Sequence, residues 1–188
     1  MQIEDVFGDF PTLETERVIL RKLTMDDAED MYEYASDSEV AKYTTWEAHN
    51  SIEDSVGFLN FLIQKYNNKQ LAPWGIMLKS NQKVIGTCGY MNWIPQINRA
   101  ELAYALSREF WGKGIMTEAA NEILEFGFDK MKLNRIEAFC LSENAGSKAL
   151  MRKIGMKHEG TLLEYIYLKG AYRDVDIRAL LRRDYVKL

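Results

Sequence analysis

The sequence has little cysteine and little histidine, which limits the chemistry open to it. Among its 188 residues there are 2 cysteines and 2 histidines. Cys88 and Cys140 each lie in an apolar, strand-like run, which predicts small buried side chains in a reducing compartment rather than a disulfide framework. Only His49 and His158 are available to join them as soft ligands, and no zinc-type spacing connects the four residues. We therefore expect no metal site.

Long apolar runs and a basic excess are also missing. Because no run reaches the roughly 18 apolar residues of a bilayer span, we expect no membrane segment. Residues 1–5 are acidic and lack the basic and then apolar pattern of a secretion signal. The net charge of −4 is unlike the basic stripe of a nucleic-acid-binding protein. We expect a cytoplasmic protein that binds neither membranes nor nucleic acid.

What the sequence does have is the ordinary make-up of a folded domain. Hydrophobic residues form 47% of the chain and charged residues 28%, and this length suffices to bury a substantial core. Neither a repeat nor a linker interrupts the chain, which predicts a single domain over residues 1–188. A mildly acidic protein is also compatible with a cationic substrate such as an amine.

The hydrophobic periodicity predicts helices and strands in an order typical of an α+β domain built on a mixed sheet. Residues 40–46 form an aromatic-rich loop or a short helix. Each of four main helices opens on a residue type that favours a helix start. These helices are expected to begin near Thr24, Ser51, Thr117 and Asn144.

Three successive strands are expected to pair as an antiparallel meander, because a hairpin signature at residues 80–82 joins the first two. A helix separates the third of them from the next strand, and a strand–helix–strand crossover favours parallel pairing. The chain ends in another predicted hairpin. The expected strands are residues 16–23, 74–79, 83–90, 98–106, 134–141, 161–168 and 172–181.

The most informative stretch runs from Asn98 to Lys130. Residues 98–106 alternate with period two, which puts Glu101 on one face with Ala103 and Ala105. Small residues on that face leave room for something to lie close to the strand. The opposite face, which is expected to pack in the core, consists of Ala100, Leu102, Tyr104 and Leu106.

Two glycines, Gly112 and Gly114, stand just before the helix whose periodicity starts at Thr117. Without Cβ atoms in the way, several backbone N–H groups can converge there at the positive end of a helix. That arrangement binds a phosphate or a pyrophosphate. The alternative is a tight strand-to-helix turn in which Thr117 is an ordinary N-cap.

Three segments together resemble the GNAT superfamily of acyl-CoA-dependent N-acetyltransferases: AELAY at residues 100–104, FWGKGIMTEA at 110–119 and NAGS at 144–147. Within the superfamily the chain looks like the Rim-type branch, whose named members acetylate the N-terminal amines of ribosomal proteins. The similarity covers nearly the whole chain. It implies a GNAT-like fold, in which the meander is followed by a parallel pair of splayed strands, and acetyl-CoA as the cofactor.

The resemblance implies a cofactor site on the glycine turn. The family's pyrophosphate loop has Arg or Gln, two variable residues, Gly, a variable residue, and then Gly or Ala. Gly112 and Gly114 match this pattern, whereas Glu109 stands at the Arg or Gln position. The family binds the phosphates mainly through backbone N–H groups. The residues implied to bind the cofactor are Leu106, Arg108, Trp111, Gly112, Lys113, Gly114, Ile115, Met116, Thr117, Asn144 and Ser147.

The resemblance also implies the path of the thioester arm. In this family the pantetheine enters the gap between the splayed strands, which would account for the small side chains of Ala103 and Ala105. Asn144 and Ser147 match an Asn-x-x-Ser element that faces the pantetheine and its sulfur. The alternative for Asn144 is a helix cap alone.

Glu101 is the expected general base, because an amine nucleophile must first lose its proton. A backbone N–H near Leu106 is expected to stabilise the charge on the carbonyl oxygen, and Ser147 to protonate the departing thiolate. Each assignment has an alternative. Glu101 would instead pair with Arg99 or Arg135, and Ser147 would be a surface residue in a first helical turn.

The expected reaction is acetyl transfer to a primary amine by direct attack in a ternary complex, with a protein N-terminus as the acceptor. The alternatives are a small amine, such as a polyamine or an aminoglycoside, and a non-catalytic acyl-CoA-binding module. The protein would act as a monomer or a homodimer. The aromatic residues expected to line the acceptor site, with core packing as the alternative for each, are Tyr43, Trp46, Trp74, Tyr90 and Trp93.

Overall fold

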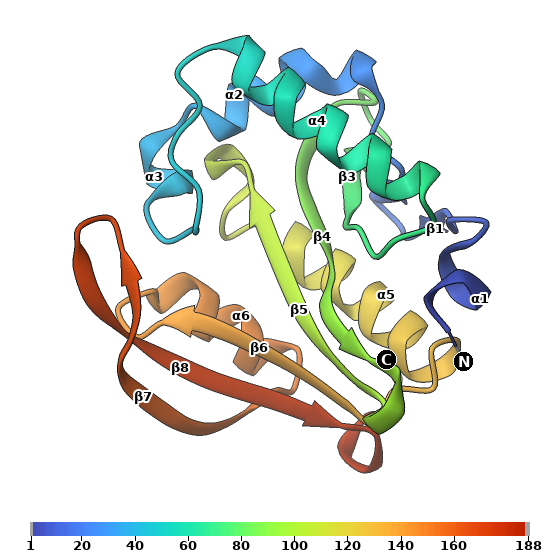
Figure 1. Ribbon diagram of the computed structural model, residues 1–188, viewed down its shortest axis with the longest axis vertical. Helices are drawn as coiled ribbons and strands as arrows, with labels where there is room; N and C mark the ends of the chain where they lie inside the picture. The colour runs from blue at the N-terminus through green and yellow to red at the C-terminus, as the bar shows by residue number, and fades with distance from the viewer. Residues whose placement is uncertain (1, 187–188) are drawn as a thin grey trace.

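The computed structural model describes residues 2–186; residues 1, 187 and 188, which the predicted domain includes, lie outside the described part. The chain forms one eight-stranded sheet flanked by helices (Figure 1). The strands are β1 (Leu13–Glu14), β2 (Val18–Arg21), β3 (Trp74–Leu78), β4 (Val84–Ile94), β5 (Arg99–Leu106), β6 (Arg135–Leu141), β7 (Lys157–Leu168) and β8 (Ala171–Leu181). The α-helices are α1 (Ile3–Phe7), α2 (Ala28–Ala35), α3 (Ser38–Ala41), α4 (Ile52–Asn67), α5 (Ile115–Asp129) and α6 (Ala145–Lys153). The 3₁₀-helices are η1 (Met25–Asp27), η2 (Pro95–Ile97), η3 (Arg108–Phe110) and η4 (Arg182–Asp184).

The strand order of the sheet is β1-β2-β3-β4-β5-β6-β8-β7. The predicted meander β3–β4–β5 is confirmed, because both of its strand pairs are antiparallel. The predicted crossover is confirmed too, since β5 continues through α5 into β6 and the two strands pair in parallel. The remaining neighbouring pairs are antiparallel, and the mixed sheet expected from the sequence is therefore present.

Helix α5 packs on one face of the sheet. The Tyr90 hydroxyl of β4 donates a hydrogen bond to the Ile123 carbonyl of α5 over 2.6 Å. Trp74 of β3 contacts Phe126 of α5 with ring centroids 5.4 Å apart. Helices α2 and α4 pack against each other, and α2 also contacts β4 (Figure 1). The apolar core is enclosed between these helices and the sheet.

The helix starts follow the sequence rules, with one correction. Ser51 forms a capping box at the start of α4, and the Asn144 side chain caps α6 by accepting from Ser147 N at 3.0 Å. Thr24 opens the short helix η1, which leads into α2. Helix α5 begins at Ile115 rather than Thr117. Gly114 adopts the left-handed cap conformation, so the helix starts as soon as the turn ends.

Two short helices add to the four that were expected. Helix α1 has 5 residues and α3 has 4, which is too short for a hydrophobic period to show in the sequence. Helix α3 overlaps the loop or short helix that was expected at residues 40–46. Within residues 2–186, no helix combines the length and apolar character needed to cross a bilayer.

Candidate active site

The loop between β5 and α5 has the shape that its two glycines allow. Gly112 and Gly114 have φ angles of +73° and +78°, in the left-handed region that residues with a Cβ rarely adopt. Gly114 is also the N-cap of α5, and it has no side chain to bond the N–H groups of the first turn. The backbone therefore requires glycine here, and the N-terminus of the helix stays open.

The first turn of α5 offers backbone donors without partners inside the helix. Its first internal bond runs from Glu118 N to Gly114 O over 3.1 Å, so the N–H groups of Ile115, Met116 and Thr117 precede the helical ladder. Nothing lies within 4 Å of the place where a Cβ of Gly112 would stand. Converging N–H groups at the positive end of a helix dipole fit a diphosphate. This loop is therefore the part of the chain suited to an anionic cofactor.

The side chains on this loop divide by exposure. Ile115 and Met116 are 5% and 7% exposed, so they can offer a ligand little besides their backbone. Trp111 is exposed, and its indole Nε1 donates to the Leu106 carbonyl over 2.8 Å, which ties the loop back to the end of β5. The exposed cations beside the glycines are Arg108 and Lys113.

Strands β5 and β6 pair over only three positions, from Arg99 opposite Arg135 to Glu101 opposite Glu137. Beyond Glu101 each strand stays bonded to its other neighbour. Strand β5 pairs with β4 as far as Leu106, and β6 pairs with β8 as far as Leu141. The two strands therefore diverge after Glu101, as the resemblance to the GNAT superfamily implied.

Backbone groups of β5 point into this gap at alternate residues. The Asn98 carbonyl accepts from Arg135 N on the β6 side, whereas Ser107 N donates to Ile85 O of β4 on the other side. Because the direction alternates along a strand, the N–H and C=O groups of even-numbered residues face β6. The Leu106 N–H, the predicted oxyanion donor, is on that side, as is the N–H of Tyr104.

Glu101 lies at the base of the gap, where the pairing ends. Its carboxylate accepts a hydrogen bond from the Asn92 side-chain amide, Nδ2 to Oε2, over 2.7 Å. The pairing of β4 with β5 is irregular between Met91 and Ile94, and Asn92 itself has a φ of +49°. This irregularity is the local feature that turns the amide toward Glu101. The carboxylate is thereby oriented while it remains partly exposed.

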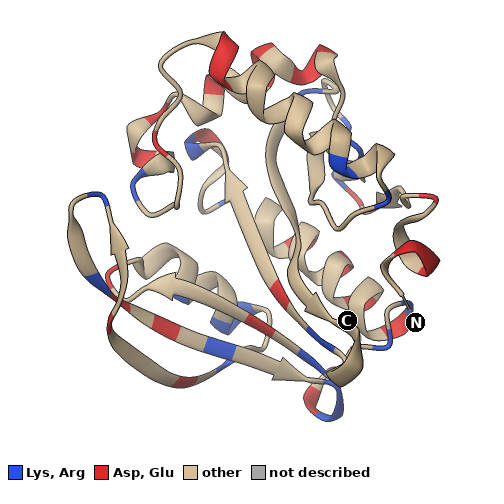
Figure 2. Cartoon of the chain, viewed as in Figure 1, with Lys and Arg blue, Asp and Glu red and all other residues tan. Residues whose placement is uncertain are grey.

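The alternative pairing of Glu101 with Arg99 or Arg135 does not occur. Both arginines instead contact Glu137, with Arg99 Nε 3.5 Å from Oε1 and Arg135 Nε 2.8 Å from Oε2. Arg135 also pairs with Glu159 at 2.6 Å. Positive and negative side chains are interspersed along β5, β6 and β8 (Figure 2). Within residues 2–186 no ion pair involves Glu101, and its carboxylate is bonded to the Asn92 amide.

Three side chains from different elements meet on the other face of β5. Tyr104 Oη lies 2.7 Å from Ser147 Oγ, in the first turn of α6. Cys140 of β6 lies close enough to Ser147 for the serine to oppose the effect of burial on its thiol. Burial raises the pKa of the Tyr104 phenol and, despite Ser147, also raises the pKa of the Cys140 thiol. Both groups therefore keep their protons at neutral pH, and Tyr104 is more than the core residue expected from the sequence.

Glu101 and Ser147 lie on opposite sides of the gap. Glu101 and Tyr104 are three residues apart on one strand, so their side chains point to opposite faces of the sheet. Tyr104 reaches Ser147, which places Ser147 on the face away from Glu101. A group held between the two strands can therefore be approached by a carboxylate from one face and a hydroxyl from the other.

Three of the aromatic residues predicted to line an acceptor site are core residues, which corrects that expectation. Trp74, Tyr90 and Trp93 are 0%, 1% and 6% exposed. Trp74 packs against Phe10 with centroids 4.9 Å apart, besides its contact with α5. The strand pattern could not reveal which face α5 covers, and these side chains lie under it or beside it. They therefore offer no surface to an acceptor.

The other two predicted residues, Tyr43 and Trp46, lie half-buried on the loop between α3 and α4. The tip of the β7–β8 hairpin reaches this loop (Figure 1). Lys169 Nζ donates to the Ala41 carbonyl over 2.6 Å and lies 3.8 Å from the Glu47 carboxylate. The α3–α4 loop and the tip of the β7–β8 hairpin, which are far apart in the sequence, thus form one surface, which we call the rim.

The rim also contains aromatic residues that were missed from the sequence. Phe139 of β6 follows Glu137 by two residues, and it therefore shares a face with Glu101. Its ring is nearly parallel to that of Tyr165 in β7, with centroids 6.4 Å apart. No local pattern could have revealed this contact, because it depends on how the hairpin curls. The exposed tyrosines of the hairpin, at 61%, 63% and 66%, are Tyr165, Tyr167 and Tyr172.

Known proteins similar to this chain include a matching family, close relatives in sequence and solved structures with the same fold. The Acetyltransferase (GNAT) domain family matches residues 17–157. The uncharacterized N-acetyltransferase p20 of Bacillus licheniformis is 38% identical over 175 residues, which cover 93% of this chain and 98% of p20. The crystal structure of a GNAT-family acetyltransferase from Bacillus anthracis has a TM-score of 0.83 and 29% identity, over 92% of this chain and 99% of that one.

Shorter matches include relatives with named acceptors. YdaF of Bacillus subtilis (strain 168), whose name proposes a ribosomal N-acetyltransferase, is 33% identical over 93 residues, 49% of this chain and 51% of YdaF. Spermidine N(1)-acetyltransferase of Escherichia coli (strain K12) is 30% identical over 88 residues, 47% of each chain. With its splayed strands, its glycine loop and a family match over most of its length, the chain belongs to the GNAT acetyltransferases, whose acetyl donor is acetyl-CoA.

Proposed function

We propose that this acetyltransferase acts on the N-terminal α-amine of a protein, such as a ribosomal protein, by direct attack in a ternary complex. The observation that carries the proposal is the end of the β5–β6 pairing at Glu101. It leaves a carboxylate at the base of the gap and an open aromatic rim on the same face. Bound acetyl-CoA would supply an activated acetyl group there, and the steps that follow concern the chain's own residues.

Glu101 is proposed to take the proton of the attacking amine, directly or through water. An α-amino group has a pKa of about 7.7–8.0, so it is mostly protonated at neutral pH and needs a base. The Asn92 amide orients the carboxylate at 2.7 Å. The neighbouring Glu137 already has Arg99 and Arg135 as partners, so it does not compete for the ammonium group.

Ser147 is proposed to give its proton to the leaving sulfur from the opposite face. A hydroxyl has one proton to donate and two lone pairs to accept with. Tyr104 keeps its proton and its hydroxyl lies 2.7 Å from Ser147 Oγ, so the phenol can donate to one lone pair of the serine oxygen. The hydroxyl proton of Ser147 is then free to point into the gap. The Leu106 N–H faces the same gap and is the proposed oxyanion donor.

A protein N-terminus is favoured as the acceptor because the rim is open. Tyr165 and Tyr167 are more than half exposed, and the α3–α4 loop faces the same hairpin. A flexible polypeptide end can cross such a surface, and its side chains can pack on the tyrosines. The partial match to YdaF supports the same class. We place the reaction in the cytoplasm, which agrees with the free thiols of Cys88 and Cys140.

A small polyamine is the second candidate acceptor, supported by the partial match to spermidine N(1)-acetyltransferase. The test is a thiol-release assay with acetyl-CoA and three acceptors: a peptide with a free N-terminus, the same peptide with a blocked N-terminus and a free lysine, and spermidine. Turnover with the first and not the others is the expected result. Turnover confined to spermidine would reject the N-terminal acceptor, and turnover with the blocked peptide would move the reaction to lysine.

A further inference from the structure

The turn between β1 and β2 is fastened to the first turn of α5. The Glu118 carboxylate accepts three hydrogen bonds from that turn: from Thr15 Oγ1 at 2.5 Å, from Arg17 N at 2.8 Å and from Arg17 Nε at 2.6 Å. Burial alone would raise the pKa of Glu118, but the hydrogen bonds from Thr15 and Arg17 outweigh it and lower that pKa. Glu118 is therefore ionised and firmly held at neutral pH.

The same arginine reaches into the glycine loop. Its Nη1 donates to the Lys113 carbonyl over 3.0 Å. Its Nη2 lies 3.5 Å from the place where a Cβ on Gly114 would stand. Lys113 is the residue between the two left-handed glycines. One guanidinium thus links the middle of the loop to the helix that the loop opens.

The contacts of Arg17 affect two properties of the loop, its conformational freedom and its charge. Glycine gives the loop its shape but leaves it free to adopt others, and ordering a loop at the moment of binding weakens affinity. In addition, Glu118 lies in the first turn of α5, where an unpaired carboxylate would repel an incoming diphosphate. Arg17 ties the loop to one conformation and neutralises Glu118.

The loop has an acid at the position where the family pattern has Arg or Gln. This acid is Glu109, and its side chain is exposed. Lys113 is turned toward a ring, with Nζ 5.3 Å from the centroid of Phe110. A cation from a distant segment, Arg17, contacts the loop instead.

We propose that Arg17 is a positioning residue for acetyl-CoA, which holds the loop 112–114 in its diphosphate-binding conformation by bridging the Lys113 carbonyl and Glu118. This inference rests on the assignment of the loop to the diphosphate. It predicts that affinity for coenzyme A depends on a side chain 101 residues before Glu118 in the sequence.

The test is calorimetric titration of coenzyme A into the wild type and into Arg17→Gln. We expect Arg17→Gln to weaken binding by about tenfold or more, which corresponds to 1.4 kcal/mol, with a matching rise in KM for acetyl-CoA and little change in kcat. Arg17→Lys should fall in between, because a lysine keeps the charge but cannot bridge two partners with a planar fork. Turnover with S-acetylpantetheine, which lacks the diphosphate, should not change.

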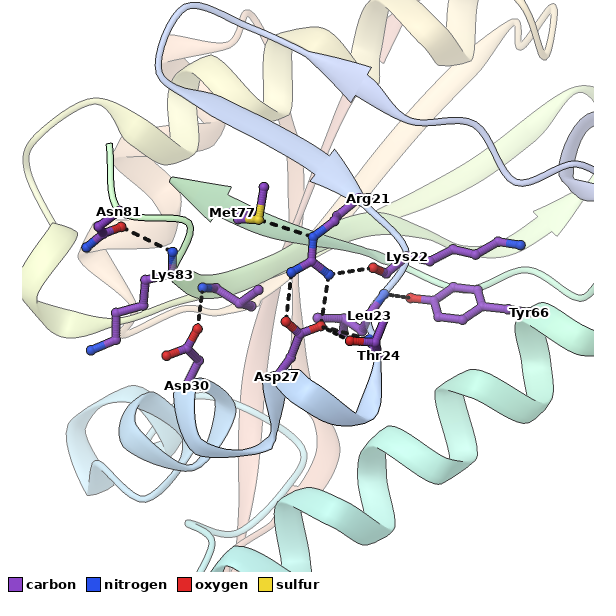
Figure 3. Close-up of polar contacts among 11 residues, drawn as sticks. Arg21, Lys22, Leu23, Thr24, Asp27, Asp30, Tyr66, Met77, Asn81 and Lys83 are labelled. Carbon is purple, nitrogen blue, oxygen red and sulfur yellow. Dashed lines mark hydrogen bonds and ion pairs between the residues drawn. The ribbon is translucent and has the colours of Figure 1, made fainter. Parts of the chain in front are cut away.

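The matched control is Arg21→Gln, at the other end of β2. Arg21 makes an ion pair that is more buried than that of Arg17, with Nη1 and Nη2 bonded to the Asp27 carboxylate at 2.9 Å and 2.7 Å (Figure 3). Its other hydrogen bonds go to Met77 and to the Lys22 carbonyl rather than to the loop. Arg21→Gln should lower thermal stability and leave coenzyme A affinity unchanged. The proposal would be overturned if Arg17→Gln lowered only the thermal stability, as Arg21→Gln is expected to do. It would also be overturned if Arg17→Gln lowered turnover with S-acetylpantetheine as much as turnover with acetyl-CoA.

Glu118→Gln covers the case in which Arg17→Gln does not fold. If the two residues act as one unit, Glu118→Gln alone should weaken coenzyme A binding, and combining it with Arg17→Lys should add little. Unchanged affinity in Glu118→Gln would reject the bridge. A wild type that binds no coenzyme A would instead reject the loop assignment itself, which is a separate failure.

Discussion

Tyr104 Oη lies 2.7 Å from Ser147 Oγ across the gap between β5 and β6. The contact brings a phenol that keeps its proton against the serine proposed to protonate the leaving thiolate. Ser147 also contacts Cys140, so its hydroxyl is supported from two strands. The serine is thereby oriented by its neighbours rather than free in a first helical turn.

Tyr104→Phe removes one of those supports without changing the shape of the core. We expect kcat to fall by about tenfold and Ser147→Ala to lower it by about 10²-fold, because a positioned proton donor contributes on that order. Coenzyme A affinity should stay the same in both. The double variant should be no slower than Ser147→Ala, and additive losses would contradict a shared role.

Glu101→Gln tests the proposed base. Turnover should fall by about 10²–10⁴-fold at neutral pH, while coenzyme A affinity stays nearly intact. The loss should shrink as the pH rises toward the pKa of the amine, because free amine then needs no base. The measurement is a pH–rate profile, with Glu29→Gln, an exposed carboxylate on α2, as the control. An unchanged profile would reject the assignment.

Gly114→Val tests the phosphate cradle. Gly114 has a φ of +78°, and a residue with a Cβ pays roughly 1–2 kcal/mol to adopt that conformation. We expect coenzyme A affinity to drop more than tenfold. Gly57→Ala in α4 is the matched control: nothing lies within 4 Å of the new methyl group, so stability should rise by up to about 1 kcal/mol. Equal coenzyme A affinity in both variants would argue against the loop as the phosphate-binding site.

Tyr165→Ala tests the aromatic rim. Tyr165 stacks on Phe139, on the face of Glu101, whereas Tyr167 packs against Tyr172 with centroids 5.1 Å apart. We expect Tyr165→Ala to raise KM for a peptide acceptor without changing coenzyme A affinity. Tyr167→Ala is the comparison variant and should have a smaller effect. An unaltered peptide KM in Tyr165→Ala would remove this residue from the acceptor site.

Acid should destabilise the protein through its paired carboxylates. A hydrogen bond from Arg135 is the main cause that lowers the pKa of Glu159, and the Thr15 and Arg17 bonds lower that of Glu118. A folded-state pKa below the unfolded value of about 4.3 means that the unfolded state binds more protons in acid. This stabilising contribution is therefore fully present above about pH 4.3 and is lost as the pH falls from there through the lower folded-state pKa. Melting temperatures between pH 7 and pH 3 measure this, and Glu159→Gln should flatten the fall below pH 5.

Much of the fold could be predicted because it is determined by residues that are close together in the sequence. The alternation around Glu101 identified β5, and the crossover rule gave its parallel partner. The two glycines located the loop, although the left-handed cap at Gly114 moved the start of α5 from Thr117 to Ile115. Local sequence carries these features because backbone conformation and strand faces are set within a few residues.

The remaining contacts of the fold and the site depend on which surfaces pack against each other, and a local sequence pattern does not carry that information. The strand period gives Trp74 and Tyr90 a face but does not say that α5 covers it. The bridge from Arg17 to Glu118 joins segments 101 residues apart. In the sequence nothing distinguishes Arg17 from an ordinary cation at the end of a strand. The strand period puts Tyr104 on the core-facing side, where it is partly buried against the core, but the partner of its hydroxyl depends on the position of α6.

The split between β5 and β6 also bears on how the protein avoids self-association. Unpaired strand edges usually recruit strands from other molecules. Here the two bare edges face each other in a wedge that is closed at Glu101 and held open by β4 and β8. A wedge of that form accepts one slender extended chain and excludes a neighbouring sheet, so the molecule can keep hydrogen-bonding groups unsatisfied for its substrate without becoming prone to aggregate.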